Sequence, residues 1–279
     1  MAEITAAAVR ELRERTDLPM MDCKKALTEA NGDQDLAVEI LKRAGLKAID
    51  KRKDNATSEG RIRVAVADDT SAAAMIELQC ESAPVAKSED FLFLGDQLAK
   101  QMLIGPGAKT PDELLSQPAP DGGKSLQEML MDVVNKIREK IVLTRVLKVE
   151  GPAGAYAHHD GKTGVIIQAK GKAGAGELLR DVSMHIAAMR PKVTLPAELD
   201  QADVETERNR LKEEALASKK PANIVDKIVD GRIKVYYAEK GVLVEQPFAK
   251  DDTKSVGKAL ADAGLEAVSF TRWVLGTDA

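Results

Sequence analysis

The sequence predicts an α+β protein with an N-terminal three-helix domain, a duplicated α+β core and a helical hairpin inserted into the second core unit. Three observations support this class. Apolar residues recur at helical spacing before about position 45, a strand–turn–strand–helix pattern occurs twice, and a highly charged stretch covers about residues 200–237. The predicted domains are therefore 1–54, 55–147 and 148–279, with the hairpin in the last of them.

Three short helices and a linker account for the N-terminal domain. Thr5 is suited to cap the first helix, because its hydroxyl can accept a hydrogen bond from an unpaired backbone N–H. The second helix is predicted to start at Pro19, since proline is favoured in a first helical turn. The third begins at Asp33 and is expected to end at Gly45. Polar residues 47–58 then form the predicted linker.

The core sequence contains one pattern twice. Each copy has two apolar strands joined by a turn and followed by a helix, at about 61–66, 72–78 and 88–102, and again at about 154–158, 164–169 and 177–188. Both copies end with a Thr-Arg pair inside an apolar run, at 143–147 and 270–275. Two such units, each with helices packed on one face of its strands, form the predicted core. A Gly/Pro-rich stretch at 105–124 is expected to be a surface loop.

The charged stretch at about 200–237 predicts two helices. A break at 218–221 contains Pro221, and the apolar residues Ile224, Ile228 and Val235 follow it as a predicted stripe. Two helices joined by a tight turn form an antiparallel hairpin. A hairpin this polar is expected to project from the body and to touch another molecule.

Composition excludes several classes of function. Aromatic residues make up only 3% of the chain and the net charge is -4, so direct binding of nucleic acid is not expected. No apolar run has the length of a membrane span, and the N-terminus does not read as a signal peptide, so we expect a cytoplasmic protein without membrane contact. Cys23 and Cys80 match no metal-binding spacing and are expected to be buried, reduced thiols.

Motifs that carry chemistry are scarce. The only histidines are His158, His159 and His185. The first two are adjacent and point in different directions, which does not suit a metal, and His185 is expected to be a hydrogen-bonded helix residue. The sequence at 123–125 resembles the end of a phosphate-binding loop but has Pro118 where the first glycine should be. We therefore predict no catalytic residue, no metal and no cofactor.

One segment is far more specific. Residues 12–27, Leu-Arg-Glu-Arg-Thr-Asp-Leu-Pro-Met-Met-Asp-Cys-Lys-Lys-Ala-Leu, closely resemble the N-terminal signature of the bacterial translation elongation factor Ts family, apart from Pro19, where the family usually has Gly or Ser. Residues 76–87 resemble its second signature, but Ser-Ala-Pro-Val stands at 82–85 where Thr-Asp-Phe-Val is usual. Further segments resemble the family at 184–188, 190–191, 219–221, 229–232, 246–248 and 254–257, so the resemblance covers essentially the whole chain.

The resemblance implies a ubiquitin-associated-like N-terminal domain and a coiled-coil hairpin on the duplicated core. It also implies a guanine-nucleotide exchange factor that binds elongation factor Tu in its GDP-bound and nucleotide-free forms. Such a factor displaces Mg²⁺ and GDP and holds the nucleotide-free state until GTP binds. A homodimer of the complex is left open by the same resemblance.

Partner-contacting residues are implied in the same way: Arg13, Met20, Met21, Ser82, Ala83, Pro84, Val85, His158 and Phe248. Those at 82–85 correspond to the loop that dislodges Mg²⁺ from the partner. Met20 and Met21 lie in the first turn of a predicted helix, where two adjacent residues cannot both face the core. Either one of them is simply exposed, or the pair forms an adaptable contact patch.

Two other functions remain open. A passive scaffold or chaperone would use the N-terminal domain and the hairpin without changing nucleotide affinity. A nucleotide-dependent enzyme would have to bind nucleotide directly, which titration of the isolated chain would detect.

Overall fold

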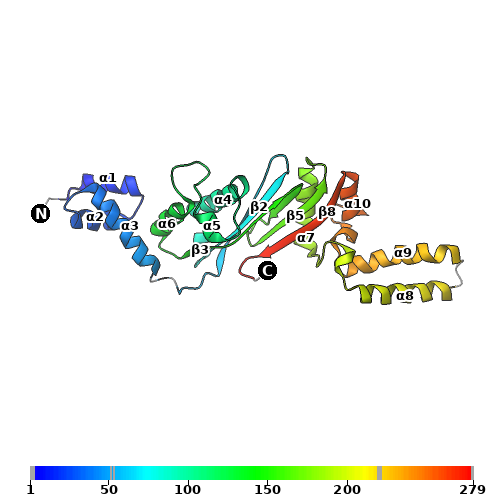
Figure 1. Cartoon of the computed structure of the whole chain (residues 1–279). Coiled ribbons are helices and arrows are strands. Elements are labelled where there is room, and N and C mark those ends of the chain that lie inside the picture. Colours follow the sequence, from blue (N-terminus) through cyan, green and yellow to red (C-terminus); the bar gives the residue numbers. More distant parts are fainter. Residues whose placement is uncertain (1–3, 51, 53, 219–221, 278–279) are drawn as a thin grey trace. The chain divides into compact units, whose positions relative to one another are not determined.

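A computed structural model describes residues 4–50, 52, 54–218 and 222–277. It confirms a mixed α+β protein in which three helices precede antiparallel sheets and further helices (Figure 1). In the described residues, no helix is long and apolar enough to cross a membrane.

The first three helices are α1 (Ala6–Thr16), α2 (Met20–Glu29) and α3 (Gln34–Asp50). Thr5 caps α1 as predicted, since its Oγ1 accepts a hydrogen bond from Ala8 N–H at 3.2 Å. The helices enclose a small core of their own: Val9, Leu12, Leu18, Cys23, Ala26, Leu27, Ala30, Ala37 and Leu41. They therefore form a bundle, called the N-terminal bundle below.

Two predictions about this bundle were wrong. Pro19 lies at the N-cap of α2, with φ -56° and ψ 137°, rather than inside its first turn. The third helix does not end at Gly45 but continues to Asp50, into the predicted linker. A glycine inside a helix costs only about 1 kcal/mol and does not by itself end one. Gly45 allows the side chain of Asn135 to approach closely, because a Cβ at this position would collide with that side chain as it is placed.

The first sheet has the strand order β1 (Glu59–Val66), β2 (Ala72–Cys80) and β3 (Ile141–Glu150). After β2 come a short 3₁₀ helix, η1 (Val85–Lys87), and α4 (Glu89–Ile104). The predicted loop at 105–124 instead contains α5 (Pro111–Leu115), capped by Thr110, which buries Leu114 and Leu115. A further helix that was not predicted, α6 (Leu126–Ile137), starts at a Ser125–Glu128 capping box.

The second sheet has the order β4 (Ala153–Ala157), β5 (Thr163–Gly171) and β8 (Leu265–Val274), with β5 antiparallel to both neighbours. Helix α7 (Gly176–Met189) packs against β4 and β5. Smaller elements complete this region: η2 (Pro196–Glu198), η3 (Leu243–Glu245), β6 (Pro247–Phe248), β7 (Asp251–Ser255) and α10 (Val256–Asp262). Their shared core includes Val165, Ile167, Leu179, Val182, Ile186, Leu243, Phe248 and Leu260.

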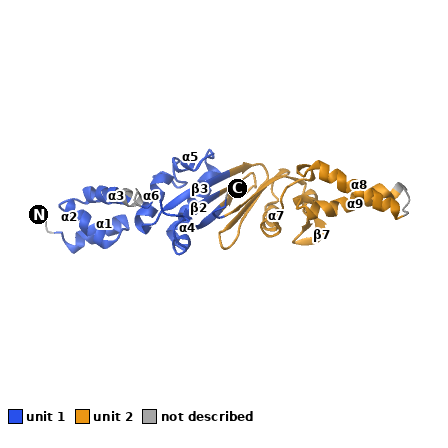
Figure 2. Ribbon diagram, turned by 90° about the horizontal axis from the view of Figure 1, so that it is seen from below, with its two compact units in different colours: residues 1–63, 76–147, 275–278 blue, residues 64–75, 148–274, 279 orange. Residues whose placement is uncertain are grey.

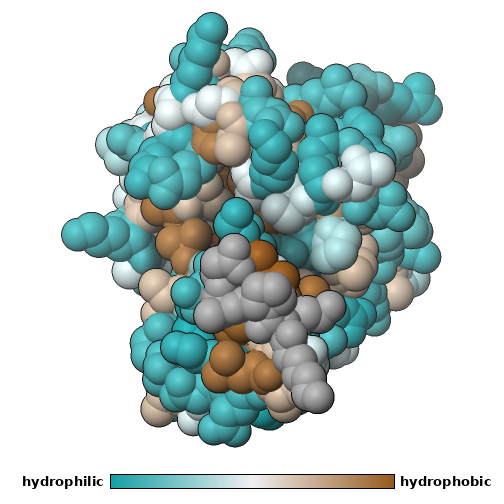
Figure 3. Space-filling model, turned by 90° about the vertical axis from the view of Figure 1, so that its right-hand side faces the viewer, coloured by the Kyte–Doolittle hydropathy of each residue, from teal (hydrophilic) through white to brown (hydrophobic). Residues whose placement is uncertain are grey.

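Two helices, α8 (Gln201–Ala217) and α9 (Ala222–Glu239), pack along each other as the predicted hairpin. The predicted apolar stripe was right only for Ile228, which is partly buried against the core of the hairpin. The buried residues of α9 are Val225, Val229 and Ile233, which pack on α8, whereas Ile224 and Val235 are exposed. Leu216 of α8 is exposed as well, and Figure 3 shows scattered apolar residues among the polar ones on one face of the molecule. The predicted break at 218–221 lies largely outside the described residues.

Contacts divide the chain into two compact units (Figure 2). Unit 1 contains 1–63, 76–147 and 275–278, and unit 2 contains 64–75, 148–274 and 279. The N-terminal bundle and most of the first α+β region thus belong to one unit. The three predicted domains remain a prediction about separately folding parts.

Candidate protein-interaction site

Met20 and Met21 form an exposed apolar pair at the start of α2. Their side chains are 49% and 62% exposed, whereas Cys23, in the same helix, is fully buried. Arg13 is exposed near the end of α1. Neither methionine contributes to the core of the bundle, so the pair is free to pack on another surface. Flexible, polarisable thioethers adapt well to such contacts.

The loop at 82–85 is held at its first residue by Glu139. Ser82 donates its backbone N–H to Glu139 Oε2 at 3.0 Å and its hydroxyl to Glu139 Oε1 at 2.6 Å. Pro84 is helical, with φ -60° and ψ -43°, and leads directly into η1. Ala83 and Pro84 are exposed and Val85 is half-buried. The loop is therefore preformed and presents two small side chains outward.

Glu81, just before the loop, is fixed from three sides. It accepts hydrogen bonds from Arg52 Nη1 at 3.0 Å, from Asn55 Nδ2 at 2.7 Å and from the backbone N–H of Lys140 at 2.6 Å. Burial raises the pKa of the Glu81 carboxyl, but these hydrogen bonds outweigh burial and leave the pKa below its ordinary value. The end of β2 is thus anchored in a charged network.

Cys23 and Cys80 are both free and buried, as predicted. Burial raises the pKa of Cys80 to about 11, which keeps it a thiol at neutral pH. Its Sγ donates a hydrogen bond to the carbonyl oxygen of Ser82 at 3.3 Å. Cys80 therefore contributes to the shape of the loop and not to nucleophilic chemistry.

His158 lies in unit 2, in the turn between β4 and β5. Its Nδ1 is 3.0 Å from the hydroxyl of Tyr156, and its ring lies against that of His159 with the centroids 4.2 Å apart. His158 is half-buried and the next two residues, His159 and Asp160, are exposed, so His158 remains a candidate contact.

Phe248 differs from the other candidates, because its side chain is only 4% exposed and packs in the core of unit 2. It neighbours His185, whose ring centroid is 6.1 Å away. His185 accepts a hydrogen bond from Ala249 N–H at Nδ1, at 3.2 Å, and its Nε2 lies 3.0 Å from Gln246 Oε1. Both ring nitrogens have partners, as predicted for a structural histidine. Phe248 can therefore support a contact surface but does not present one.

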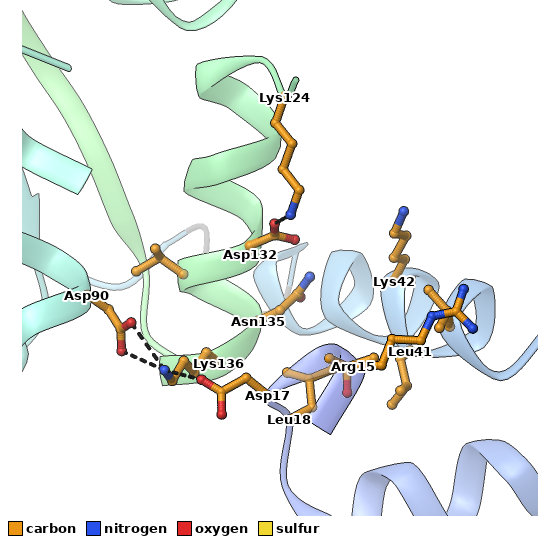
Figure 4. A pocket seen from close by; sticks show the side chains of 13 residues that line it. Arg15, Asp17, Leu18, Leu41, Lys42, Asp90, Lys124, Asp132, Asn135 and Lys136 are labelled. Carbon is orange, nitrogen blue, oxygen red and sulfur yellow. Dashed lines mark hydrogen bonds and ion pairs between the residues drawn. The ribbon is translucent and has the colours of Figure 1, made fainter. Parts of the chain in front are cut away.

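A crevice of about 420 Å³ lies between the N-terminal bundle and α6 (Figure 4). Its walls carry charges of both signs, and the labelled side chains in Figure 4 are Arg15, Asp17, Leu18, Leu41, Lys42, Asp90, Lys124, Asp132, Asn135 and Lys136. Lys136 bridges Asp17 of the bundle and Asp90 of α4. Within the described part of the chain, no group of three or more His, Cys, Asp or Glu side chains could hold a metal ion.

Sequence reasoning missed the residues that hold these candidates in place. Glu139 lies 57 positions from Ser82, and Arg138, which pairs with Asp22, lies 116 positions from it. No spacing rule links positions so far apart. The signals that were available are local, such as the capping box that starts α6.

Comparison with known proteins gives one consistent result. The family model described as Elongation factor TS matches residues 84–277. Elongation factor Ts of Thioalkalivibrio sulfidiphilus (strain HL-EbGR7) is 39% identical over 276 residues, which cover 98% of this chain and 92% of that protein. Elongation factor Ts of Aquifex aeolicus (strain VF5) is 40% identical over 280 residues, which cover 96% of each chain. The Elongation factor Ts of Clostridium perfringens (strain 13 / Type A) is 37% identical over 280 residues, 97% of this chain and 91% of that protein.

Proposed function

This chain belongs to the elongation factor Ts family, and we propose how its surface performs the activity of that family, nucleotide exchange on elongation factor Tu. Members are exchange factors and not enzymes, so the chain binds elongation factor Tu and makes or breaks no covalent bond. The similarity over nearly the whole chain is the observation that carries this function.

The N-terminal bundle supplies affinity for the nucleotide-binding part of elongation factor Tu in this proposal. The exposed pair Met20 and Met21 packs on the partner, and Arg13 adds a charged contact beside it. The pair is exposed on a bundle with its own core, so it can be buried in a complex without unfolding anything. Its burial is driven by the hydrophobic effect.

The 82–85 loop acts on the bound nucleotide in this proposal. It enters the partner near the Mg²⁺ site and helps to displace Mg²⁺ and GDP. Pro84 and the hydrogen bonds of Ser82 to Glu139 support this role, because a preformed loop loses little conformational entropy on docking. The loop has no large aromatic side chain, so it acts by displacing backbone and water.

The finer architecture belongs to the same proposal. The bundle is ubiquitin-associated-like, the two sheet regions are copies of one unit, and α8 with α9 forms a coiled-coil arm. The sheets support a duplication, since in each the second strand along the chain lies in the centre. His158 adds a contact from unit 2, with Phe248 beneath the surface. A homodimer of the complex is a separate proposal, which light scattering of the complex would test.

Release of a fluorescent GDP from cognate elongation factor Tu tests the function. The chain is expected to accelerate release in proportion to its concentration until the complex is saturated. Release at the unassisted rate, with binding intact, would favour the passive scaffold instead. Nucleotide binding by the isolated chain would favour the enzyme.

A further inference from the structure

Five consecutive residues at the end of α6, called the 136–140 segment, contact both the N-terminal bundle and the residues around the 82–85 loop. Toward the N-terminal bundle, Lys136 pairs with Asp17 at the end of α1. Arg138 Nη2 lies 2.9 Å from Asp22 Oδ2. Asp22 follows Met21 directly in the first turn of α2, so this ion pair fixes the turn that presents both methionines.

The same segment holds the 82–85 loop. Glu139 accepts both hydrogen bonds of Ser82, at 3.0 and 2.6 Å, and Lys140 N–H donates to Glu81 at 2.6 Å. Lys140 Nζ also donates to the carbonyl oxygen of Asn55 at 2.9 Å. Neighbouring residues of one short segment thus bind the methionine turn on one side and the loop on the other.

Arg138 occupies a backbone position that favours glycine. It is the C-cap of α6, with φ 65° and ψ 27°, in the left-handed region. Glycine adopts this conformation without a steric penalty, whereas other residues pay one. Arginine at this position is explained by its side chain, which is only 32% exposed and reaches Asp22.

The crevice in Figure 4 shows what lies between the bundle and α6 besides the ion pairs of Lys136 and Arg138. Its walls combine charged side chains with apolar ones such as Leu18, Leu41 and Val133, and Asn135 packs closely against Gly45. Asn135 is 8% exposed and its Oδ1 has no hydrogen-bond partner. The ion pairs of Lys136 and Arg138 add two polar links between the bundle and the end of α6 to this packing.

We propose that the 136–140 segment is a positioning element that holds the Met20–Met21 turn and the 82–85 loop in one fixed arrangement, so that both engage the partner together. Arg138 is its central positioning residue. The inference rests on the proposed function, because it assigns the segment to the two contacts that exchange uses.

Arg138→Gly tests this without threatening the fold, because it removes the ion pair and also the left-handed strain. Its Tm is expected to equal or exceed that of the wild type. GDP release at subsaturating concentration is expected to slow about three- to fivefold, the upper part of the range for a partly exposed ion pair. Arg138→Lys, which keeps a cation for Asp22, should stay within about twofold of the wild type.

Asp132→Asn is the matched control, since it breaks the ion pair of Asp132 in α6 with Lys124, which lines the same crevice but joins α6 to neither the bundle nor the loop. It should release GDP at the wild-type rate. The inference is overturned if Arg138→Gly also releases GDP at the wild-type rate, or if Asp132→Asn slows it as much.

A second measurement does not depend on exchange. Spin labels on cysteines introduced at Lys25 and Lys87, both exposed, report the distance between α2 and the loop region. The distance distribution should be narrow in the otherwise wild-type chain and broad with Arg138→Gly. Equal widths would overturn the inference even if Arg138→Gly slows GDP release. A failure of the wild type to accelerate release would refute the proposed function alone.

Discussion

Met20 and Met21 are the residues whose replacement is most clearly expected to affect binding without affecting folding. Both are about half exposed or more and neither is part of the core of the bundle. Burying each in a complex contributes roughly 1.5–3 kcal/mol, less the entropy of fixing the side chain. The double variant Met20→Ala, Met21→Ala is therefore expected to weaken binding of elongation factor Tu at least about tenfold, measured by titration, with an unchanged Tm.

Leu36→Ala provides the control, because Leu36 is 41% exposed on α3 of the same bundle. It should bind with the wild-type affinity. A lower Tm for the methionine variant would show that the pair supports the fold, and equal loss of affinity in both variants would show that exposed apolar area alone is responsible.

His185 makes the stability of unit 2 dependent on pH. Burial lowers its pKa from the ordinary 6.5, and the hydrogen bond with Gln246 offsets this only in part. The unfolded chain therefore takes up a proton at a higher pH than the folded chain does. The stabilisation is complete above about pH 6.5 and is lost as the pH falls below it, by about 1.4 kcal/mol for each unit of pKa depression.

Urea unfolding of the wild type and of His185→Gln between pH 7.5 and 5 measures this contribution. The variant removes the titrating group, so the free-energy difference between the two proteins should shrink as the pH falls. A difference that stays constant with pH would show that His185 is protonated equally in both states.

At the scale of single elements, changes in the 82–85 loop are expected to affect GDP release more than binding of elongation factor Tu. Replacing Pro84 and Val85 with glycine removes the restricted φ of proline and the apolar side chain that leads into η1. GDP release is expected to slow by at least about tenfold, while binding of nucleotide-free elongation factor Tu weakens less than about threefold. The reason is that the proposed role of the loop is to displace the nucleotide, so the entropy cost of ordering a flexible loop falls mainly on that step.

Equal losses of both quantities would mean that the loop is only a contact surface. No loss in either would assign exchange to the bundle and to unit 2. Ser116→Gly is a suitable control, since it introduces glycine at an exposed position of unit 1 away from the loop.

Two valines of α9 allow a test of which of its apolar residues are buried in the hairpin. Val229 of α9 is 2% exposed and packs on α8, whereas Val235 is 58% exposed. Val229→Ala is expected to destabilise the hairpin by about 1–2 kcal/mol, because it leaves a cavity. Hydrogen exchange of the amides of α8 and α9 should accelerate accordingly.

Val235→Ala is the matched control, since it has the same change in helix propensity without the loss of packing. Its exchange rates should equal those of the wild type or be slower. Faster exchange in Val235→Ala than in Val229→Ala would reverse the assignment of the buried stripe.

The helices and strands show which parts of the fold can be predicted from the periodicity of apolar residues. Strands β4 and β5 and the first two helices of the bundle lie close to their predicted ranges, because alternation and capping are local signals. The stripe of α9 could not be placed in this way, since Ile224 and Ile228 compete with Val225 and Val229 as apolar residues spaced by four. Only packing against Leu211 and Ala215 of α8 decides between them.

At the scale of the whole molecule, the candidate contact residues could be predicted from the sequence better than the residues that hold them in place. Helix geometry excluded only that both adjacent methionines face the core, and it left open whether one or both are exposed. The anchors Arg138 and Glu139 could not be inferred, because they act through contacts that span 116 and 57 positions. Long-range ion pairs carry no periodic signal in a sequence.

Relative affinity for the two states of elongation factor Tu tests the central claim most directly. An exchange factor must bind the nucleotide-free state more tightly than the GDP-bound state, because a ligand shifts an equilibrium only by its differential affinity. Calorimetric titration of the chain into each form should give at least about tenfold tighter binding to the nucleotide-free form, within the usual range of coupling between sites. Equal affinity for the two forms would contradict the account, since the chain would then be a passive scaffold.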